Sequence, residues 1–323
     1  MADEGARAGI VRLPARDVDP PAGISDHARE ALTQGRPESG PFPTDGDKDA
    51  WRAAIAATEA ARAGLTGDLG QRLKADVMAH PLGGVPAYVA TPRAERLVDS
   101  HFVLLDIHGG ALIFGGGEAA VSLNAQIMAL RAGRVAYSVD YRMPPDHPYP
   151  AALDDCLAAY RALLEIRPAS EIILSGVSAG GNLAAALLLR ARDEGLPTPA
   201  GALLMTPEVD LTESGDSFQT LVGLDFLKPL IEINRLYADG HDLAHPYLSP
   251  LFGEVSAFPP TFLQAGTRDI FLSNTVRLHR KLRTAGVRAE LHVWEGMPHG
   301  GFGGFTPEDR EMNVEMRAFI ASL

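Results

Sequence analysis

Short apolar runs and longer segments of helical periodicity alternate along this chain from about residue 102 onward. The apolar runs predict strands at residues 102–107, 134–139, 171–175, 201–205, 261–264 and 289–294. Helices are predicted between them at residues 118–132, 150–166, 183–194 and 272–285, and Thr306-Pro307-Glu308-Asp309 begins a last one. Such alternation is typical of an α/β fold, a mostly parallel sheet with helices on both faces, in which functional groups gather at the carboxyl ends of the strands.

Two stretches fall outside this alternation. Residues 1–50 are rich in proline, glycine and charge, and an amphipathic helix with Trp51 and Ile55 on one face follows them. Residues 208–246 carry phenylalanines and leucines that have no clear place in the pattern. We predict a cap segment at residues 1–75 and a second one at about 208–246, both covering the strand ends of a main domain at residues 76–323. Ordinary helical decoration of the core is the alternative for both.

The first hundred residues contain one further strand signal. Val85, Ala87 and Val89 alternate with other residues, as they would along a strand with one face against the core. This run predicts an antiparallel strand at the edge of the sheet.

The charge balance limits which kinds of molecule the protein is expected to bind. With 29 Lys and Arg against 41 Asp and Glu, the formal net charge is −12, which argues against a basic surface for nucleic acids or anionic membranes. The N-terminus lacks a basic start followed by an apolar core, and no apolar segment is long enough to span a bilayer. We therefore expect a cytoplasmic protein that acts on a small molecule. The single cysteine, Cys156, lies in an apolar helical pattern and is predicted to be a buried, inert thiol.

A serine bracketed by glycines lies between a predicted strand and a predicted helix. In Gly176-Val177-Ser178-Ala179-Gly180, a sharp turn must join the two elements, and such a turn pushes the serine hydroxyl outward. Gly176 and Gly180 supply the room that a Cβ would deny to the crossing strand and helix. Ser178 is therefore a candidate nucleophile, and a serine in an ordinary glycine-rich loop is the alternative.

A serine nucleophile needs an imidazole to take its proton and a carboxylate to orient the imidazole. In this architecture the expected chain order is serine, acid, histidine, each on a loop after a strand. Asp269 and His299 satisfy that order, although an aspartate at the position of Asp269 is also typical of a helix cap. The rival residues are His241, His245, His279, Asp225, Asp239 and Asp242.

Acyl transfer also requires backbone N–H groups that stabilise the oxyanion, at roughly 3 to 4 kcal/mol per donor. His108-Gly109-Gly110-Ala111 follows the strand predicted at residues 102–107, so flexible backbone lies at a strand's carboxyl end beside the serine turn. We assign the oxyanion donors to the N–H groups of Gly109, Gly110 and Ala179, and we interpret His108 as a structural residue of this loop. The glycines at residues 115–117 lack the Lys and Ser/Thr of a phosphate loop and are expected to shape the pocket wall.

Three blocks of the sequence resemble the bacterial hormone-sensitive lipase (family IV) esterases of the α/β-hydrolase superfamily. They are residues 108–111, the long block from Asp140 to Asp155, and residues 176–182. With Asp269 and His299 the resemblance covers roughly residues 75–320. The family's pattern implies scaffold roles for Asp140, Arg142 and Asp154.

The resemblance implies an α/β-hydrolase fold and a serine carboxylesterase that hydrolyses short-chain or small apolar esters through an acyl-enzyme, without a metal or organic cofactor. A lactone hydrolase or an acyltransferase on the same triad is the alternative. A non-catalytic ligand-binding protein on this fold would have lost the histidine that this chain has at position 299. The resemblance also implies a homodimer through residues 289–294 and 272–285.

The substrate pocket is predicted from apolar residues near the triad and in the second cap segment. We assign it to Ala111, Phe114, Phe218, Leu224 and Phe302. Three positions depart from the family pattern: Val177 replaces an acidic residue before the serine, Ala111 stands where a third glycine is common, and Glu208 stands where many relatives are apolar or aromatic. We interpret Glu208 as a solvated loop charge.

Overall fold

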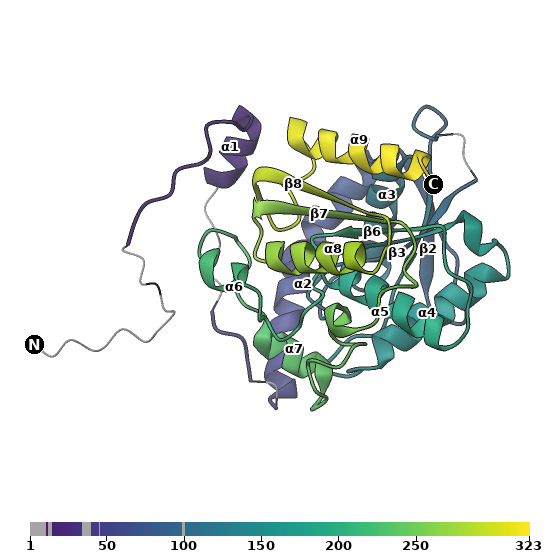
Figure 1. Cartoon of the computed structure of the whole chain (residues 1–323), viewed down its shortest axis with the longest axis horizontal. Helices are drawn as coiled ribbons and strands as arrows, with labels where there is room; N and C mark the ends of the chain where they lie inside the picture. The colour runs from purple at the N-terminus through teal and green to yellow at the C-terminus, as the bar shows by residue number, and fades with distance from the viewer. Residues whose placement is uncertain (1–10, 12–14, 34–39, 45, 99–100) are drawn as a thin grey trace, which may run out of the picture.

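The computed structural model describes residues 11, 15–33, 40–44, 46–98 and 101–323, without the side chains of residues 64–68. Within this part of the chain an eight-stranded sheet forms the centre of the molecule, in the order β1-β2-β4-β3-β5-β6-β7-β8 (Figure 1). Strands β1 and β2 are antiparallel to their neighbours, and the other pairs are parallel. The strands are β1 (Ala75–Ala79), β2 (Ala87–Pro92), β3 (Val103–Ile107), β4 (Val135–Val139), β5 (Ile172–Val177), β6 (Gly201–Met205), β7 (Thr261–Arg268) and β8 (Ala289–Pro298).

The six predicted parallel strands are all present as β3 to β8, so the predicted α/β fold is confirmed. The antiparallel strand near Val85 is confirmed as β2, but its predicted position at the edge is wrong because β1 pairs along its outer side. In β1 only Ala75 is buried, so this strand has no alternating apolar pattern by which sequence could reveal it.

The helices cover both faces of the sheet. Helices α4, α5 and α8 pack on one face, and α3 and α9 on the other, because successive residues of each buried strand point to opposite sides. In β3, for example, Leu105 belongs to the first core and Leu104 to the second. The helices are α1 (Asp26–Thr33), α2 (Lys48–Arg72), α3 (Glu118–Ala132), α4 (Ala151–Leu164), α5 (Ala179–Asp193), α6 (Ser217–Thr220), α7 (Ile231–Ala238), α8 (Leu272–Thr284) and α9 (Pro307–Ala321).

Helix α9 begins where the sequence predicts it. The Thr306 hydroxyl accepts from the Asp309 amide at 3.2 Å, and the Asp309 carboxylate accepts from the Thr306 amide at 3.1 Å. Pro307 is the first residue of the helix, where the amide of any residue would lack a partner within the helix, so proline loses no hydrogen bond there. This capping box fixes the start of the helix.

The two stretches outside the alternation share one apolar cluster. Trp51 of α2, Phe218 of α6 and Ile233 of α7 pack together with Ile113 and Phe271, which lie on the loops after β3 and β7. Figure 1 shows α2, α6 and α7 on the side of the molecule where these loops lie. Both stretches therefore contact the carboxyl ends of the strands. Residues 1–10, 12–14, 34–39 and 45 of the predicted N-terminal cap lie outside the described residues.

Helix α1 is separate from this cluster. Its Ala28 packs with Ile24, Met297 and Phe302, and the Ser25 hydroxyl donates to Glu308 at 2.8 Å. This segment therefore lies against the end of β8 and the start of α9.

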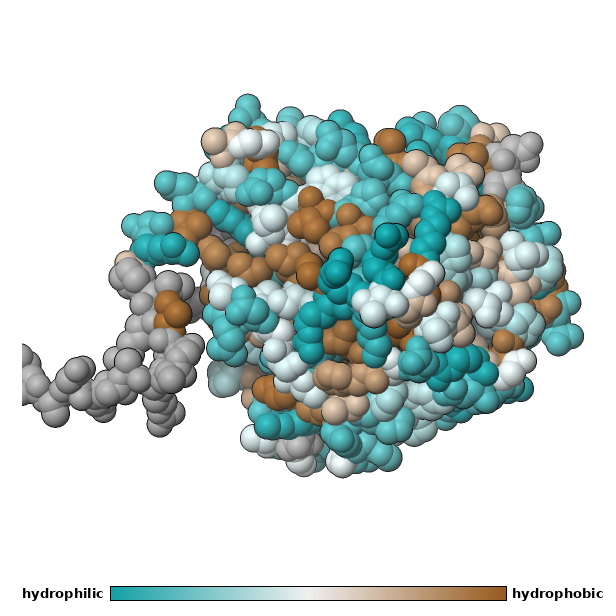
Figure 2. All heavy atoms as spheres, in the orientation of Figure 1, coloured by the Kyte–Doolittle hydropathy of each residue, from teal (hydrophilic) through white to brown (hydrophobic). Residues whose placement is uncertain are grey.

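Strand β8 is the last strand of the sheet, and its outer edge pairs with no other strand of the described chain. Val293 of β8 and Val276 of α8 are 43% and 37% exposed. Figure 2 shows apolar side chains gathered on the face of the molecule that carries α8 and β8. None of the described helices is both long and apolar enough to cross a bilayer.

Candidate active site

Ser178 lies at the sharp turn between β5 and α5, in a strained backbone conformation with φ 58° and ψ −123°. Its amide donates to the Met205 carbonyl at 2.9 Å, which ties the turn to β6. A Cβ at position 180 would lie 1.9 Å from the Ile107 carbonyl oxygen, and one at position 176 would lie 2.2 Å from the Gly180 oxygen. Only glycine fits at both places, as the sequence predicts.

The three predicted triad residues meet at this turn. The Ser178 Oγ lies 2.9 Å from Nε2 of His299, and Nδ1 of His299 lies 3.0 Å from Oδ1 of Asp269. Asp269 follows β7 and His299 follows β8, so both reach the serine from carboxyl ends of the sheet. An ionised carboxylate only accepts hydrogen bonds, so Nδ1 donates to Asp269 and Nε2 remains to accept from the serine hydroxyl.

The environment of His299 makes its imidazole more basic. Burial lowers its pKa, but the negative charges of Asp269 and Asp225 and the hydrogen bond to Asp269 outweigh burial, so the pKa is raised above its ordinary value. The ring also meets the edge of Phe271, with centroids 4.7 Å apart. An imidazole held in this way is suited to take a proton from the serine.

Asp225 is a second acidic group at this site, named from the sequence only as a rival to Asp269. It lies between α6 and α7 and is 2% exposed. Its Oδ2 accepts from the Ile270 amide at 2.7 Å, and its Oδ1 accepts from the His299 amide at 3.2 Å. An acidic residue inside the apolar run Leu224-Asp225-Phe226 was the one sequence signal for its burial.

Asp225, Asp269 and His299 also offer ligand atoms that all lie within 4.8 Å of one another, the one such group found among the described residues. Hydrogen bonds already engage His299 Nδ1, Asp269 Oδ1 and both Asp225 oxygens. These hydrogen bonds fix the two carboxylates and orient the imidazole, which is the arrangement that a general base beside a serine needs.

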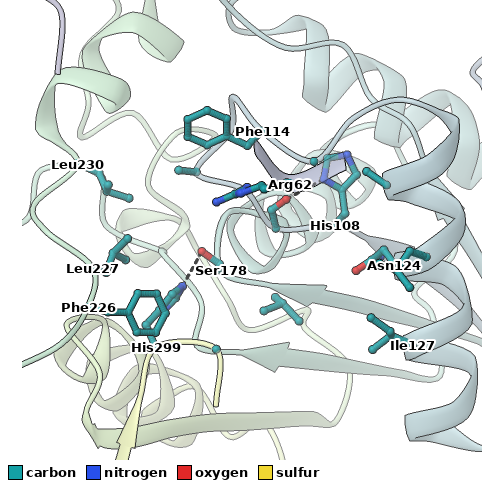
Figure 3. A pocket seen from close by; sticks show the side chains of 18 of the residues that line it. Arg62, His108, Phe114, Asn124, Ile127, Ser178, Phe226, Leu227, Leu230 and His299 are labelled. Atoms are coloured by element: carbon teal, nitrogen blue, oxygen red, sulfur yellow. Dashed lines mark hydrogen bonds between the residues drawn. The ribbon is translucent and has the colours of Figure 1, made fainter. Parts of the chain in front are cut away.

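A cavity of about 480 Å³ opens on Ser178 and His299. Figure 3 shows Ser178 between two walls, with Asn124 and Ile127 on one side and Phe226, Leu227 and Leu230 on the other. The first wall is one face of α3, because its lining residues recur three and four positions apart, at Ala120, Leu123, Asn124, Ile127, Met128 and Arg131. The second wall comes from the segment predicted as a cap.

Two of the five residues predicted for the substrate pocket, Ala111 and Phe114, line this cavity. Phe218, Leu224 and Phe302 are not among its described lining residues. Phe218 is buried with Phe271 beneath the second wall, and Phe302 packs against Ile24, Ala28 and Met297. The segment has no regular helix at Leu224, so periodicity gave no way to tell that Phe226 and Leu227 face the cavity instead.

The glycine-rich loop after β3 lies beside the serine, as predicted. Gly109 and Gly110 line the cavity, and Gly110 has φ 127°. A Cβ at position 110 would lie 2.0 Å from the Phe114 carbonyl oxygen, so the tight turn requires glycine. His108 is structural: its Nδ1 lies 2.8 Å from the Gly109 oxygen, and its ring stacks on Tyr141 at 4.1 Å.

The predicted scaffold residues join neighbouring segments of the chain. Asp140 accepts from the Gly117 amide at 2.9 Å, Arg142 forms a bidentate pair with Asp155, and Asp154 pairs with Arg190 of α5. Cys156 is fully buried, and burial raises the pKa of its thiol, which agrees with an inert role.

The interpretation of Glu208 as a solvated charge is wrong. Its side chain is 0% exposed, and neither carboxylate oxygen has a hydrogen-bond partner among the described residues. Its amide donates to the Ser178 carbonyl at 3.3 Å, and its own carbonyl accepts from the Asn182 amide group at 2.7 Å. These bonds hold the loop of Glu208 against the nucleophile turn, so its carboxyl group lies in the protein interior.

Comparison with known proteins agrees with this geometry. Residues 104–303 match the family described as the alpha/beta hydrolase fold. The chain is 34% identical to an acetyl-hydrolase of Streptomyces hygroscopicus over 61% of this chain and 67% of the relative. It is 32% identical to an esterase of Acinetobacter venetianus over 74% of this chain and 82% of the relative.

Solved structures are similar over nearly the whole length. One esterase crystal structure aligns with a TM-score of 0.88 and 34% identity, covering 97% of this chain and 98% of the other. An esterase from the bacterial hormone-sensitive lipase family aligns with a TM-score of 0.77 and 28% identity, covering 92% and 98%. Since the family match spans more than half of the 323 residues, this chain belongs to the α/β hydrolase fold family and is a carboxylic ester hydrolase of its hormone-sensitive lipase group.

Proposed function

We propose that the protein is a serine carboxylesterase that hydrolyses short-chain or small apolar esters through an acyl-enzyme on Ser178. The observation that carries this proposal is the 2.9 Å contact between Ser178 Oγ and His299 Nε2 at the wall of the cavity. A nucleophile and base at that distance need no rearrangement before proton transfer.

In the first half of the reaction, Ser178 Oγ attacks the ester carbonyl while its proton passes to Nε2 of His299. Asp269 stabilises the imidazolium through the hydrogen bond at Nδ1. The proton then moves to the alcohol oxygen, the alcohol leaves, and the acyl group remains on the serine. In the second half, His299 takes a proton from water while the water oxygen attacks the acyl carbonyl. The proton then passes from His299 to Ser178 Oγ as the acyl–serine bond breaks, so the carboxylic acid leaves and the free serine is restored.

The negative charge that develops on the carbonyl oxygen needs donors that are already in place. The amides of Gly109 and Gly110 lie in the tight loop beside Ser178, and the amide of Ala179 is the first of α5. We assign the oxyanion hole to these three groups: the first two amides lie beside the serine, and the amide of Ala179 lies at the positive end of the α5 dipole.

A small substrate is favoured by the cavity and by the relatives. A volume of about 480 Å³ lies within the range for small-molecule sites, and the two walls offer mainly apolar side chains. One relative is named acetyl-hydrolase. We assign the acyl group to the side of α3 and the alcohol group to the side of Phe226 and Leu227, with residues 208–246 acting as a cap.

The test is turnover of p-nitrophenyl acetate, butyrate and dodecanoate by the wild type and by Ser178→Ala. We expect the short esters to be preferred and Ser178→Ala to lose about 10⁴-fold or more in kcat. Ser256→Ala, which alters an exposed serine, is the control and should keep full activity. Undiminished turnover by Ser178→Ala would remove the assignment, and a preference for dodecanoate would contradict the substrate class.

A further inference from the structure

Asp225 joins the predicted cap segment to both loops that carry the acid and the base. Its two carboxylate oxygens accept from different backbone amides, Oδ2 from Ile270 and Oδ1 from His299. Ile270 directly follows Asp269, so one side chain holds the peptide next to the acid and the peptide of the base itself. These residues are 45 and 74 positions away from Asp225.

We infer that Asp225 is a positioning residue of the catalytic site, which fixes the loops of Asp269 and His299 relative to each other and adds a second negative charge beside the imidazole. The inference rests on the function proposed above. It assigns to residues 208–246 a role in the chemistry besides covering the cavity.

The burial of Asp225 explains why the second charge matters. At 2% exposure its carboxyl group is shielded from solvent, and its ligand atom lies within 4.8 Å of those of Asp269 and His299. Charges this close and this poorly solvated interact strongly. The charged groups that act on His299 are Asp269, on the loop after β7, and Asp225, on the segment between α6 and α7, and both favour the imidazolium.

Asp225 also has a reason to be an aspartate and not an asparagine. A carboxylate offers acceptors on both oxygens, so it accepts from two amides at once. An asparagine of the same shape offers one acceptor and turns an NH₂ group toward the other amide. The substitution therefore removes the charge and one of the two bonds while it leaves the volume unchanged.

The experiment measures kcat, KM and the pH profile of kcat/KM for Asp225→Asn with p-nitrophenyl acetate. We expect kcat to fall about tenfold to a hundredfold, the cost of a small misplacement of a reacting group, with KM within about twofold of the wild type. The acid limb of the profile should move to lower pH, because His299 loses a charge that favours its protonated form. Asp216→Asn, an exposed aspartate of the same segment, is the control and should match the wild type.

A second measurement separates positioning from general destabilisation. Asp225 and Asp269 act through the same imidazole, so the double variant Asp225→Asn with Asp269→Asn should lose less than the product of the two single losses. Independent losses, an unmoved acid limb, or a change confined to the melting temperature or KM would each overturn the inference. If Asp225→Asn does not fold, Asp225→Ser is used with the same expectations. The turnover of the wild type and of Ser178→Ala is measured in the same assay. Undiminished turnover by Ser178→Ala would contradict the proposed function itself, whereas the results above concern Asp225 alone.

Discussion

The Ser178 hydroxyl and Nε2 of His299 lie 2.9 Å apart although 121 positions separate them in the chain. This contact works only while the imidazole is neutral, since a protonated Nε2 has no lone pair to accept the serine proton. Burial opposes the imidazolium, but Asp269 and Asp225 raise the pKa of His299 above its ordinary value near 6.5. We predict that kcat/KM falls as the pH drops through a midpoint above 6.5. A rate profile between pH 5 and 9 measures this, and a midpoint below 6.5 would contradict the assignment.

Ile127 and Arg131 lie one turn apart on α3 and line both the active-site cavity and a second cavity of about 390 Å³. These two side chains therefore separate the cavities. We predict that Ile127→Ala opens the wall and raises kcat/KM for p-nitrophenyl hexanoate relative to butyrate by about tenfold, the value of a buried methylene group or two. Leu130→Ala is the matched control, because Leu130 lines the second cavity and not the active-site cavity. The prediction fails if both variants keep the wild-type chain-length preference.

Glu208 predicts an unusual dependence of stability on pH. Burial, helped by the nearby charges of Glu213 and Asp210, raises its pKa from an ordinary value of 4.5 to about 8. The folded state therefore holds a proton that the unfolded state releases, so the free energy of unfolding decreases as the pH rises from about 4.5 to about 8.

A neutral side chain at position 208 should remove this effect. We predict that Glu208→Gln unfolds at a higher urea concentration than the wild type at pH 8.5 and shows little difference at pH 4.5. Urea unfolding at both values provides the measurement, with Glu254→Gln, an exposed glutamate, as the control. If Glu208→Gln stabilised the protein more at pH 4.5 than at pH 8.5, the raised pKa of Glu208 would be contradicted.

The free edge of β8 leads to a prediction about assembly. Val293 on this strand is 43% exposed, and pairing of two edges around a twofold axis would cover it. We predict a homodimer through β8 and α8, which light scattering after size-exclusion chromatography measures. Val293→Lys should shift the protein to monomer, whereas Val314→Lys on α9 should not. A monomeric wild type at micromolar concentration would exclude this interface.

The sequence predicted those features that depend on local pattern. The nucleophile turn could be recognised because the crossing of one strand and the next helix requires glycine at positions 176 and 180, on either side of Ser178. The order of Asp269 and His299 after their strands follows from parallel topology, which brings carboxyl ends to one edge.

Features that depend on contacts between distant segments could not be predicted. Glu208 is buried because its amide donates to the Ser178 carbonyl and its carbonyl accepts from the Asn182 side chain, and no property of the neighbouring residues reveals these bonds. Asp225 meets its partners through loops distant in sequence. The cavity side of residues 224–227 has no helical period that would distinguish Leu224 from Phe226.

The most direct measurement of the central claim is the site of covalent modification by a p-nitrophenyl alkylphosphonate. Such a reagent phosphonylates an activated serine and releases p-nitrophenol, and the adduct is stable enough for peptide mass spectrometry. We predict one adduct per chain on the peptide that contains Ser178, with concurrent loss of esterase activity, and no adduct in His299→Ala. An adduct on another residue, or full activity in protein modified at Ser178, would contradict the account.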